Sequence, residues 1–248
     1  MRLYLGQIAE DQKNYPDALR WYGEVTGGEL YLRAQTRYAM VLNKQGQLDA
    51  ARAHLHQVET GSNEGRVQLL LTEAQMLRDA NRAREAFDML ESALKNMPDQ
   101  PELLYDYAML AEKLGQLDVL ESNLTKLIRL QPEHAHAYNA LGYSLADRNL
   151  RLPEAQELIE KALKLAPDDP FIVDSMGWVL YRRGMQQQAL EYLRKAYSAR
   201  PDPEIAAHLG EVLWIAGERR EAEKVWREAA SKTPDNEALN STIKRFKP

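Results

Sequence analysis

Two pairs of histidines have the spacing in this chain that most resembles a metal site: His54 with His56, and His134 with His136. Imidazole nitrogens bind zinc and other transition metals, so such pairs are candidate ligands. Residues two apart on a helix point in different directions, and a helix is the structure that we expect around His54. His134 and His136 lie near an expected turn, where chelation is possible. The sequence favours ordinary surface histidines over a metal site.

No other group of residues has the spacing of a catalytic site. The chain has 37 Asp and Glu residues, and nothing singles out a catalytic pair among them. We expect most of them on solvated helix faces and at helix caps. A Gly-rich phosphate loop, a His-Glu-x-x-His motif and a Gly-x-Ser-x-Gly motif are all absent from the sequence. There is no cysteine, which excludes disulfides and thiolate metal sites. The sequence therefore predicts a non-enzymatic protein without a cofactor.

The elements that would position any site follow a repeat. An alanine, or a leucine in its place, recurs at steps of 33 to 35 residues, at Ala18, Ala51, Ala86, Leu120, Ala155, Ala189 and Ala222. A period near 34 indicates an array of one supersecondary unit, whose copies must stack because one copy cannot bury its own apolar face. The predicted copies are residues 1–28, 32–63, 67–98, 101–132, 135–167, 170–201 and 203–234, of which the first is truncated. A capping helix over 236–246 follows them.

The sixth copy illustrates the expected unit. Its apolar residues fall at helical spacing on two segments of roughly a dozen residues. Gly184 lies between these segments, where a left-handed backbone suits a short turn. Gly177 and Ala189 are small enough to let the paired helices approach closely. Asp169 is a good cap and Pro170 suits the first turn of a helix. The repeat therefore predicts an all-α protein built from helix pairs.

Composition and chain ends add further expectations. The formal net charge of -5 and the lack of a basic stripe argue against nucleic-acid binding. No apolar run approaches the roughly 20 residues that span a bilayer. Leu5 and Gly6 already occupy the Leu-Gly position, without room before them for a full first turn. We therefore expect the chain to be cut at its N-terminus from a longer protein, and to end at a native C-terminus.

The copies resemble the tetratricopeptide repeat, in which a large residue, Leu-Gly, a second large residue, an Ala, an aromatic and a closing Pro occur at these offsets. The resemblance covers essentially the whole chain. It implies one domain, residues 1–248, folded as a right-handed superhelical solenoid of helix-turn-helix repeats with a C-terminal capping helix. Arrays of this kind usually bind other proteins and seldom catalyse. In this family the first helix of each repeat, helix A, tends to line a concave groove.

The family's groove positions, carried onto this chain, give a partner-binding groove of Tyr105, Met109, Asn139, Tyr143, Phe171, Asp174, Trp178, Tyr181 and Trp214. Its aromatic members would form a track with polar groups beside it, which is the composition of protein-binding hot spots. We expect Trp178 and Tyr143 to be exposed in the groove, and Asn139 and Asp174 to hydrogen-bond an extended peptide backbone. A shift of one position in register would bury half of these aromatics in the core between repeats.

The groove chemistry disfavours a co-chaperone role. Repeats that hold the C-terminal carboxylate of cytosolic heat-shock chaperones use a clamp of Lys, Asn and Arg. The matching positions here are Asn139, Asp174, Tyr143 and Trp178, which do not form such a clamp.

A closer resemblance covers residues 140–148, 158–162, 166–170 and 174–181. These segments are similar to the C-terminal half of large proteobacterial repeat proteins that are exported and lipid-anchored at the outer membrane.

At least one member of that group is an adaptor, which binds a carboxyl-terminal processing protease in the periplasm and helps to deliver cell-wall hydrolases to it. The resemblance implies the same role for this chain, at the periplasmic face of the outer membrane of a Gram-negative bacterium. Its partners would be the protease and the hydrolases, and its only membrane attachment would be an N-terminal lipid anchor missing from this sequence. Two alternatives stay open: an assembly factor for a pilus or secretion machinery, and the regulatory repeat region of a larger enzyme.

Overall fold

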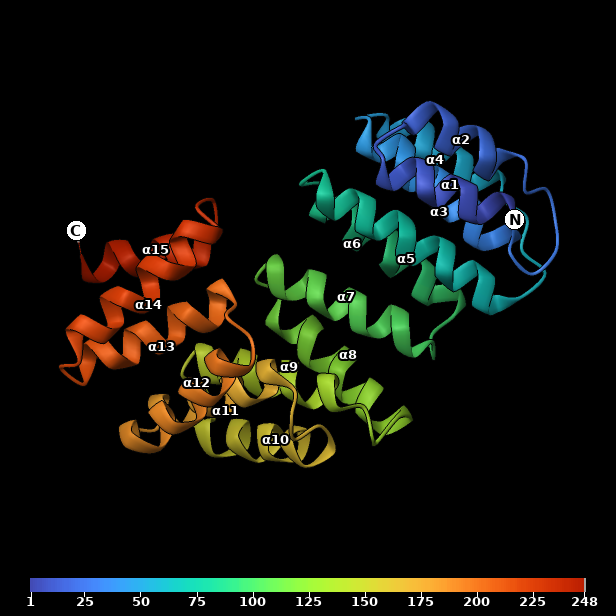
Figure 1. The fold of residues 1–248 in the computed structure, drawn as a ribbon. Helices are drawn as coiled ribbons and strands as arrows, with labels where there is room; N and C mark the ends of the chain where they lie inside the picture. Colours follow the sequence, from blue (N-terminus) through green and yellow to red (C-terminus); the bar gives the residue numbers. More distant parts are fainter. Residues whose placement is uncertain (248) are drawn as a thin grey trace. The chain divides into compact units, whose positions relative to one another are not determined.

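The computed structural model describes residues 1–247, and every regular element in this range is an α-helix. Fifteen helices follow one another through it, joined by short connections (Figure 1). The all-α fold predicted from the repeat is therefore confirmed. No helix of the described range has both the length and the apolar character that crossing a bilayer would require. The chain divides into two compact units, Met1–Asn123 and Leu124–Pro248, and the division falls inside α8 (Leu117–Leu130).

The first unit begins with three helix pairs and continues into α7. Its helices are α1 (Arg2–Asp11), α2 (Tyr15–Gly23), α3 (Tyr31–Lys44), α4 (Leu48–Gln57), α5 (Asn63–Asp79), α6 (Ala83–Asn96) and α7 (Pro101–Lys113). Within it, α1 packs on α2, α3 on α4 and α5 on α6. The odd-numbered helices are therefore the first helix of each pair, which is helix A of the predicted repeat.

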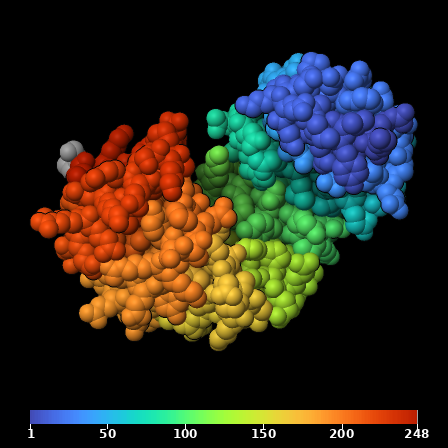
Figure 2. Space-filling view, viewed as in Figure 1, coloured from blue at the N-terminus to red at the C-terminus, as the bar shows by residue number. Residues whose placement is uncertain are grey.

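The second unit has the same plan and ends in an additional helix. Its helices are α9 (Ala135–Asp147), α10 (Leu152–Leu165), α11 (Pro170–Arg182), α12 (Gln186–Ala199), α13 (Pro203–Ile215), α14 (Arg219–Lys232) and α15 (Glu237–Phe246). The pairs are α9 with α10, α11 with α12 and α13 with α14. The final helix α15, red in Figures 1 and 2, packs on α13 and α14 and covers the last pair.

The turn inside each pair is the same throughout the described range. A residue with φ between 58° and 86° closes it, at Lys13, Gly46, Asn81, Gly115, Asn149, Gly184 and Gly217. The next residue donates its N–H to the carbonyl five residues back, as Met185 does to Leu180 over 2.9 Å. This bond satisfies a helix-end carbonyl and requires the left-handed conformation that Gly and Asn tolerate best. The turn predicted at Gly184 is confirmed.

The recurring alanines, and the leucine that replaces one of them, are fully buried. The exposed fraction is 0% at Ala18, Ala51, Ala86, Leu120, Ala155, Ala189 and Ala222. Gly177 of α11 faces α12, and a Cβ added to it would lie 2.6 Å from Leu193 Cγ. Because carbon atoms cannot approach so closely, only glycine fits without moving the helices apart. This confirms that small residues set the distance between the paired helices.

The helix starts follow the predicted capping chemistry. Asp169 Oδ1 accepts hydrogen bonds from the backbone N–H groups of Phe171 (2.9 Å) and Ile172 (3.2 Å) at the start of α11. Asp202 repeats this one copy later, accepting from Glu204 N over 2.9 Å, and a proline follows each aspartate. Each carboxylate satisfies N–H groups that have no partner within the helix.

Candidate functional site

In the second unit, His208 of α13 gathers side chains from two other helices. Its Nδ1 lies 2.8 Å from Asp174 Oδ2, and its Nε2 lies 3.3 Å from the hydroxyl oxygen of Tyr143. The imidazole also stacks on the indole of Trp178, with ring centroids 4.2 Å apart and an angle of 21° between the planes. One histidine therefore connects the first helices of three successive pairs.

The electrostatics of this cluster favour a charged imidazole. Burial by itself lowers the pKa of His208, but the charge and hydrogen bond of Asp174, with smaller contributions from Asp147 and Glu211, hold that pKa above its ordinary value. When protonated, Nδ1–H donates to Asp174 and Nε2–H donates to the Tyr143 oxygen. Both ring nitrogens are then occupied within the protein, so this cluster acts as a cross-link between repeats rather than as a base for a substrate.

A second cluster attaches the final helix. Glu211 of α13 accepts a hydrogen bond from the Tyr181 hydroxyl over 3.3 Å and forms an ion pair with Arg245 of α15. Burial raises the pKa of Glu211, and Arg245 opposes this shift. Phe246 lies beside Trp214, with ring centroids 6.4 Å apart. The cluster holds α15 on α13 by charge and by aromatic packing together.

The predicted groove residues divide by burial. The exposure expected of Trp178 is wrong, because its side chain is only 5% exposed beneath His208. The expectation that Asp174 is accessible to a peptide backbone is also wrong, because this residue is 5% exposed and bonded to His208. Asn139, Tyr143, Tyr181 and Trp214 are half-buried, and Phe171 is 37% exposed beneath the Arg200 guanidinium. Tyr105 and Met109 lie half-buried on α7 of the first unit.

Three buried polar atoms of this region make no hydrogen bond within the described residues: Asn139 Oδ1, Asp174 Oδ1 and Trp178 Nε1. The predicted groove positions on α9 and α11 thus combine aromatic packing with buried polar atoms.

The histidine pairs contact different partners. His54 Nε2 lies 2.8 Å from Gln35 Oε1, whereas His56 Nε2 lies 2.8 Å from Glu73 Oε2. His134 Nδ1 accepts the backbone N–H of Ala137 and caps α9, and His136 is exposed. Within residues 1–247 no group of three or more His, Cys, Asp or Glu side chains is arranged to hold a metal ion.

The first unit has a surface that the sequence reasoning missed, the α3/α5/α7 groove. It encloses about 500 Å³ and is lined by Met40, Glu64, Val67, Gln68, Leu71, Thr72, Gln75, Arg78, Gln100, Glu102 and Asp106. These residues come from the first helices of successive pairs and from the residue preceding α7. The run Leu69-Leu70-Leu71 could have indicated this surface. Three consecutive residues cannot all face one side of a helix, so not all of these leucines can face the same neighbouring helix.

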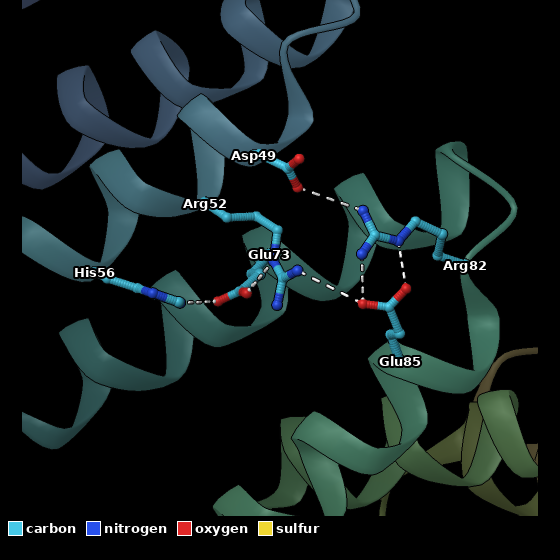
Figure 3. A network of polar contacts seen from close by, with 6 residues as sticks. All are labelled: Asp49, Arg52, His56, Glu73, Arg82 and Glu85. Carbon is cyan, nitrogen blue, oxygen red and sulfur yellow. Dashed lines mark hydrogen bonds and ion pairs between the residues drawn. The ribbon is translucent and has the colours of Figure 1, made fainter.

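A polar network holds α5 from behind this groove. Figure 3 shows Glu73 of α5 between two side chains of α4, Arg52 at 2.7 Å and His56 at 2.8 Å. Arg52 also reaches Glu85 of α6 at 3.6 Å. Two residues along a helix are rotated by roughly 200°, so Glu73 faces away from Leu71 of the groove. The network therefore fixes one face of α5 and leaves the other open.

Comparison with known proteins gives consistent results. The family model of the tetratricopeptide repeat matches residues 121–170. The TPR repeat-containing protein PA4667 of Pseudomonas aeruginosa is 45% identical over 197 residues, which is 79% of this chain and 33% of that protein. The chain therefore spans about a third of the length of this relative.

Solved structures share the fold. The thermophilic TPR protein TTC0263 of Thermus thermophilus is 25% identical and superposes with a TM-score of 0.65, over 73% of this chain and 98% of its own. A tetratricopeptide repeat protein from Parabacteroides merdae covers 100% of this chain and 98% of its own, with a TM-score of 0.75 at 14% identity. Because the same helix pair, turn and period recur along the described residues, we conclude that the chain is a tetratricopeptide repeat protein.

Proposed function

We propose that this chain is a non-enzymatic scaffold that binds protein or peptide partners on the first helices of its repeats. The observation that carries the proposal is the α3/α5/α7 groove, which combines an apolar floor with polar groups around it. Tetratricopeptide repeats bind other proteins or peptides, and such a groove offers the surface for it.

The finer proposal concerns the partners and the compartment. The chain acts as an adaptor at the periplasmic face of the outer membrane, where it brings cell-wall hydrolases to a carboxyl-terminal processing protease. Support comes from the resemblance of residues 140–181 to exported proteobacterial adaptors, and from the 45% identity with a Pseudomonas aeruginosa protein. An adaptor needs more than one binding surface, and the half-buried aromatics Tyr143 and Tyr181 of the second unit are candidates for another.

Affinity capture tests both levels of the proposal. The chain is immobilised, and proteins retained from separate periplasmic and cytosolic extracts of Pseudomonas aeruginosa are identified by mass spectrometry. Leu71→Glu places a charge on the groove floor, whereas Leu150→Glu makes the same change at an exposed position after α9 and serves as the control. Circular dichroism establishes that both variants are folded.

A processing protease or cell-wall hydrolase from the periplasm, lost with Leu71→Glu and kept with Leu150→Glu, is the expected result. Retention of a secretin or pilus component would instead favour the assembly role. Partners from the cytosol alone would overturn the proposed compartment, and no specific partner from either extract would overturn the scaffold function itself.

A further inference from the structure

Resting on the proposed scaffold function, we propose that the α3/α5/α7 groove binds an extended peptide in which an apolar side chain is flanked by lysine or arginine. The groove lies wholly within the first unit and is built by α3, α5 and the start of α7. Three features of its lining identify this occupant: an apolar floor, an excess of carboxylates and side-chain amides.

The floor selects an apolar side chain. Val67 and Leu71 are four residues apart on α5 and therefore share one face of that helix. Met40 of α3 completes the apolar part of the lining. Leu71 and Met40 are half-buried, so part of their apolar surface stays in contact with water in the free protein. An apolar side chain placed there would remove this surface from water together with its own, which is the main favourable contribution to such contacts.

The charges of the lining select basic neighbours. Three carboxylates, Glu64, Glu102 and Asp106, line the groove against one cation, Arg78. Arg78 is occupied, because it donates to Asp106 Oδ2 over 2.9 Å and to Gln75 Oε1 over 2.6 Å. Within the lining, Glu64 and Glu102 are left without a balancing cation, in the first turns of α5 and α7. They attract lysine or arginine and repel acidic residues.

The amides suit a peptide backbone in extended form. Gln68 on α5 and Gln100 before α7 each offer both N–H donors and a carbonyl acceptor. An extended backbone presents its N–H and C=O groups outward, unlike a helix, in which they are bonded internally. Amides beside an apolar floor can therefore hold the backbone while one side chain enters the groove.

Selection from a random peptide library tests the occupant. Phage-displayed peptides are selected on the whole chain, and those that also bind Leu71→Glu are discarded. The enriched peptides are expected to share an apolar residue with lysine or arginine within two positions. Enrichment of acidic or neutral flanks, or of no peptide that depends on Leu71, would overturn the proposal.

A charge variant keeps the test informative if Leu71→Glu alters the fold. The double variant Glu64→Gln with Glu102→Gln is expected to lower the affinity for an enriched peptide about fivefold to tenfold, as measured by fluorescence anisotropy. It is also expected to reduce the dependence of that affinity on salt. Asp88→Asn with Glu91→Gln makes the same change of net charge on α6, outside the groove, and is expected to change affinity by less than about twofold. Equal effects of the two variants would exclude a specific role for the rim carboxylates.

The scaffold function and the proposed occupant of the α3/α5/α7 groove can fail separately. If wild type and Leu71→Glu retain the same proteins in affinity capture, and no groove-dependent peptide is enriched, the scaffold function stands but uses another surface. If the chain retains no partner at all, the scaffold function fails whatever the library shows.

Discussion

Asp174 and His208 lie on successive first helices, α11 and α13, 34 residues apart in the chain, and their side chains meet at 2.8 Å. Two further pairs have the same separation of 34 residues, Glu10 with Lys44 and Glu211 with Arg245. In each pair an acidic residue on one first helix bonds a basic residue on the next helix of that kind or on the final helix. Complementary charges about one repeat apart are therefore a way in which neighbouring repeats are joined.

The Asp174–His208 pair predicts that the second unit loses stability as pH rises. Asp174, Asp147 and Glu211 keep the folded-state pKa of His208 above its ordinary value near 6.5, although burial opposes this. The contribution is fully present below about pH 6.5 and is lost as pH rises through the folded-state pKa. Urea unfolding from pH 6 upward should therefore show a declining free energy of unfolding, and His208→Gln should flatten the decline.

Glu211 needs its own control, because its pKa is also raised. A raised carboxyl pKa also makes the free energy of unfolding fall as pH rises. For Glu211 this fall begins above the ordinary glutamate value of 4.5, which is a lower pH than for His208. Glu211→Gln should therefore reduce the pH dependence on the acidic side, where Glu204, whose pKa burial also raises, contributes as well. It should leave most of the dependence between about pH 6.5 and the folded-state pKa of His208, to which Glu211 is a smaller contributor. A pH profile unchanged in His208→Gln would contradict the assignment to His208.

Trp178 is expected to matter for stability more than for partner binding. Its side chain is 5% exposed, stacked beneath His208 and next to Tyr181 at a ring distance of 5.3 Å. Truncating a buried tryptophan costs about 3–5 kcal/mol, so Trp178→Ala should strongly lower the unfolding midpoint of the second unit. Tyr143→Phe removes only a hydroxyl 3.3 Å from His208 and should cost about 0.5–1.5 kcal/mol. Equal stability of wild type and Trp178→Ala would contradict the burial.

The difference between prediction and structure at Trp178 has a physical reason. Period, turns and caps depend on backbone rules that operate within one repeat, so Gly184 and Asp169 could be placed from the sequence. Whether a helix A aromatic faces solvent depends on the side chain of the next repeat, here His208, and the repeat pattern does not specify that residue. A search for opposite charges 34 residues apart would have identified His208 as the partner of Asp174.

The α3/α5/α7 groove escaped prediction for a related reason. The family positions gave aromatic candidates in the fourth to seventh repeats, whereas the groove floor consists of Met40, Val67 and Leu71 in the second and third. Aliphatic residues at helical spacing look the same in the sequence whether they face a core or a groove. Only the packing of α5, held by Glu73 on its opposite face, shows that Leu71 stays half-buried at the surface.

The approach of α11 and α12 predicts a large effect from one methyl group. A Cβ at Gly177 would lie 2.6 Å from Leu193 Cγ and 3.1 Å from the Ala189 carbonyl oxygen, so Gly177→Ala should destabilise the chain by about 1–3 kcal/mol. Gly61 has no atom within 4 Å of its added Cβ, and Gly61→Ala is the matched control, expected to be neutral or slightly stabilising. Thermal unfolding of the two variants compares them directly, and equal midpoints would contradict the close approach.

The network around Glu73 predicts that one carboxylate carries more stability than its neighbour. Glu73 is 3% exposed and binds both Arg52 and His56, so Glu73→Gln should cost about 1–3 kcal/mol, because it leaves buried hydrogen-bonding groups poorly paired. Glu85 belongs to the same network but is 43% exposed, so Glu85→Gln should have a clearly smaller effect. Denaturant unfolding measures both, and a larger loss with Glu85→Gln would show that the exposed half of the network dominates.

Glu10 predicts that the first unit depends on pH in the opposite direction to the second. Burial alone would raise the pKa of Glu10, but hydrogen bonds from Lys44 and Tyr22 and the charge of Arg37 outweigh it and hold that pKa below its ordinary value of 4.5. Stability from Glu10 is therefore present above about pH 4.5 and is lost as pH falls through the folded-state pKa. Hydrogen exchange read by mass spectrometry separates the units: peptides from α1–α3 should lose protection on acidification while those from α11–α13 keep it. Glu10→Gln should abolish this acid sensitivity in α1–α3, and sensitivity of these helices that persists in the variant would assign it to another carboxylate.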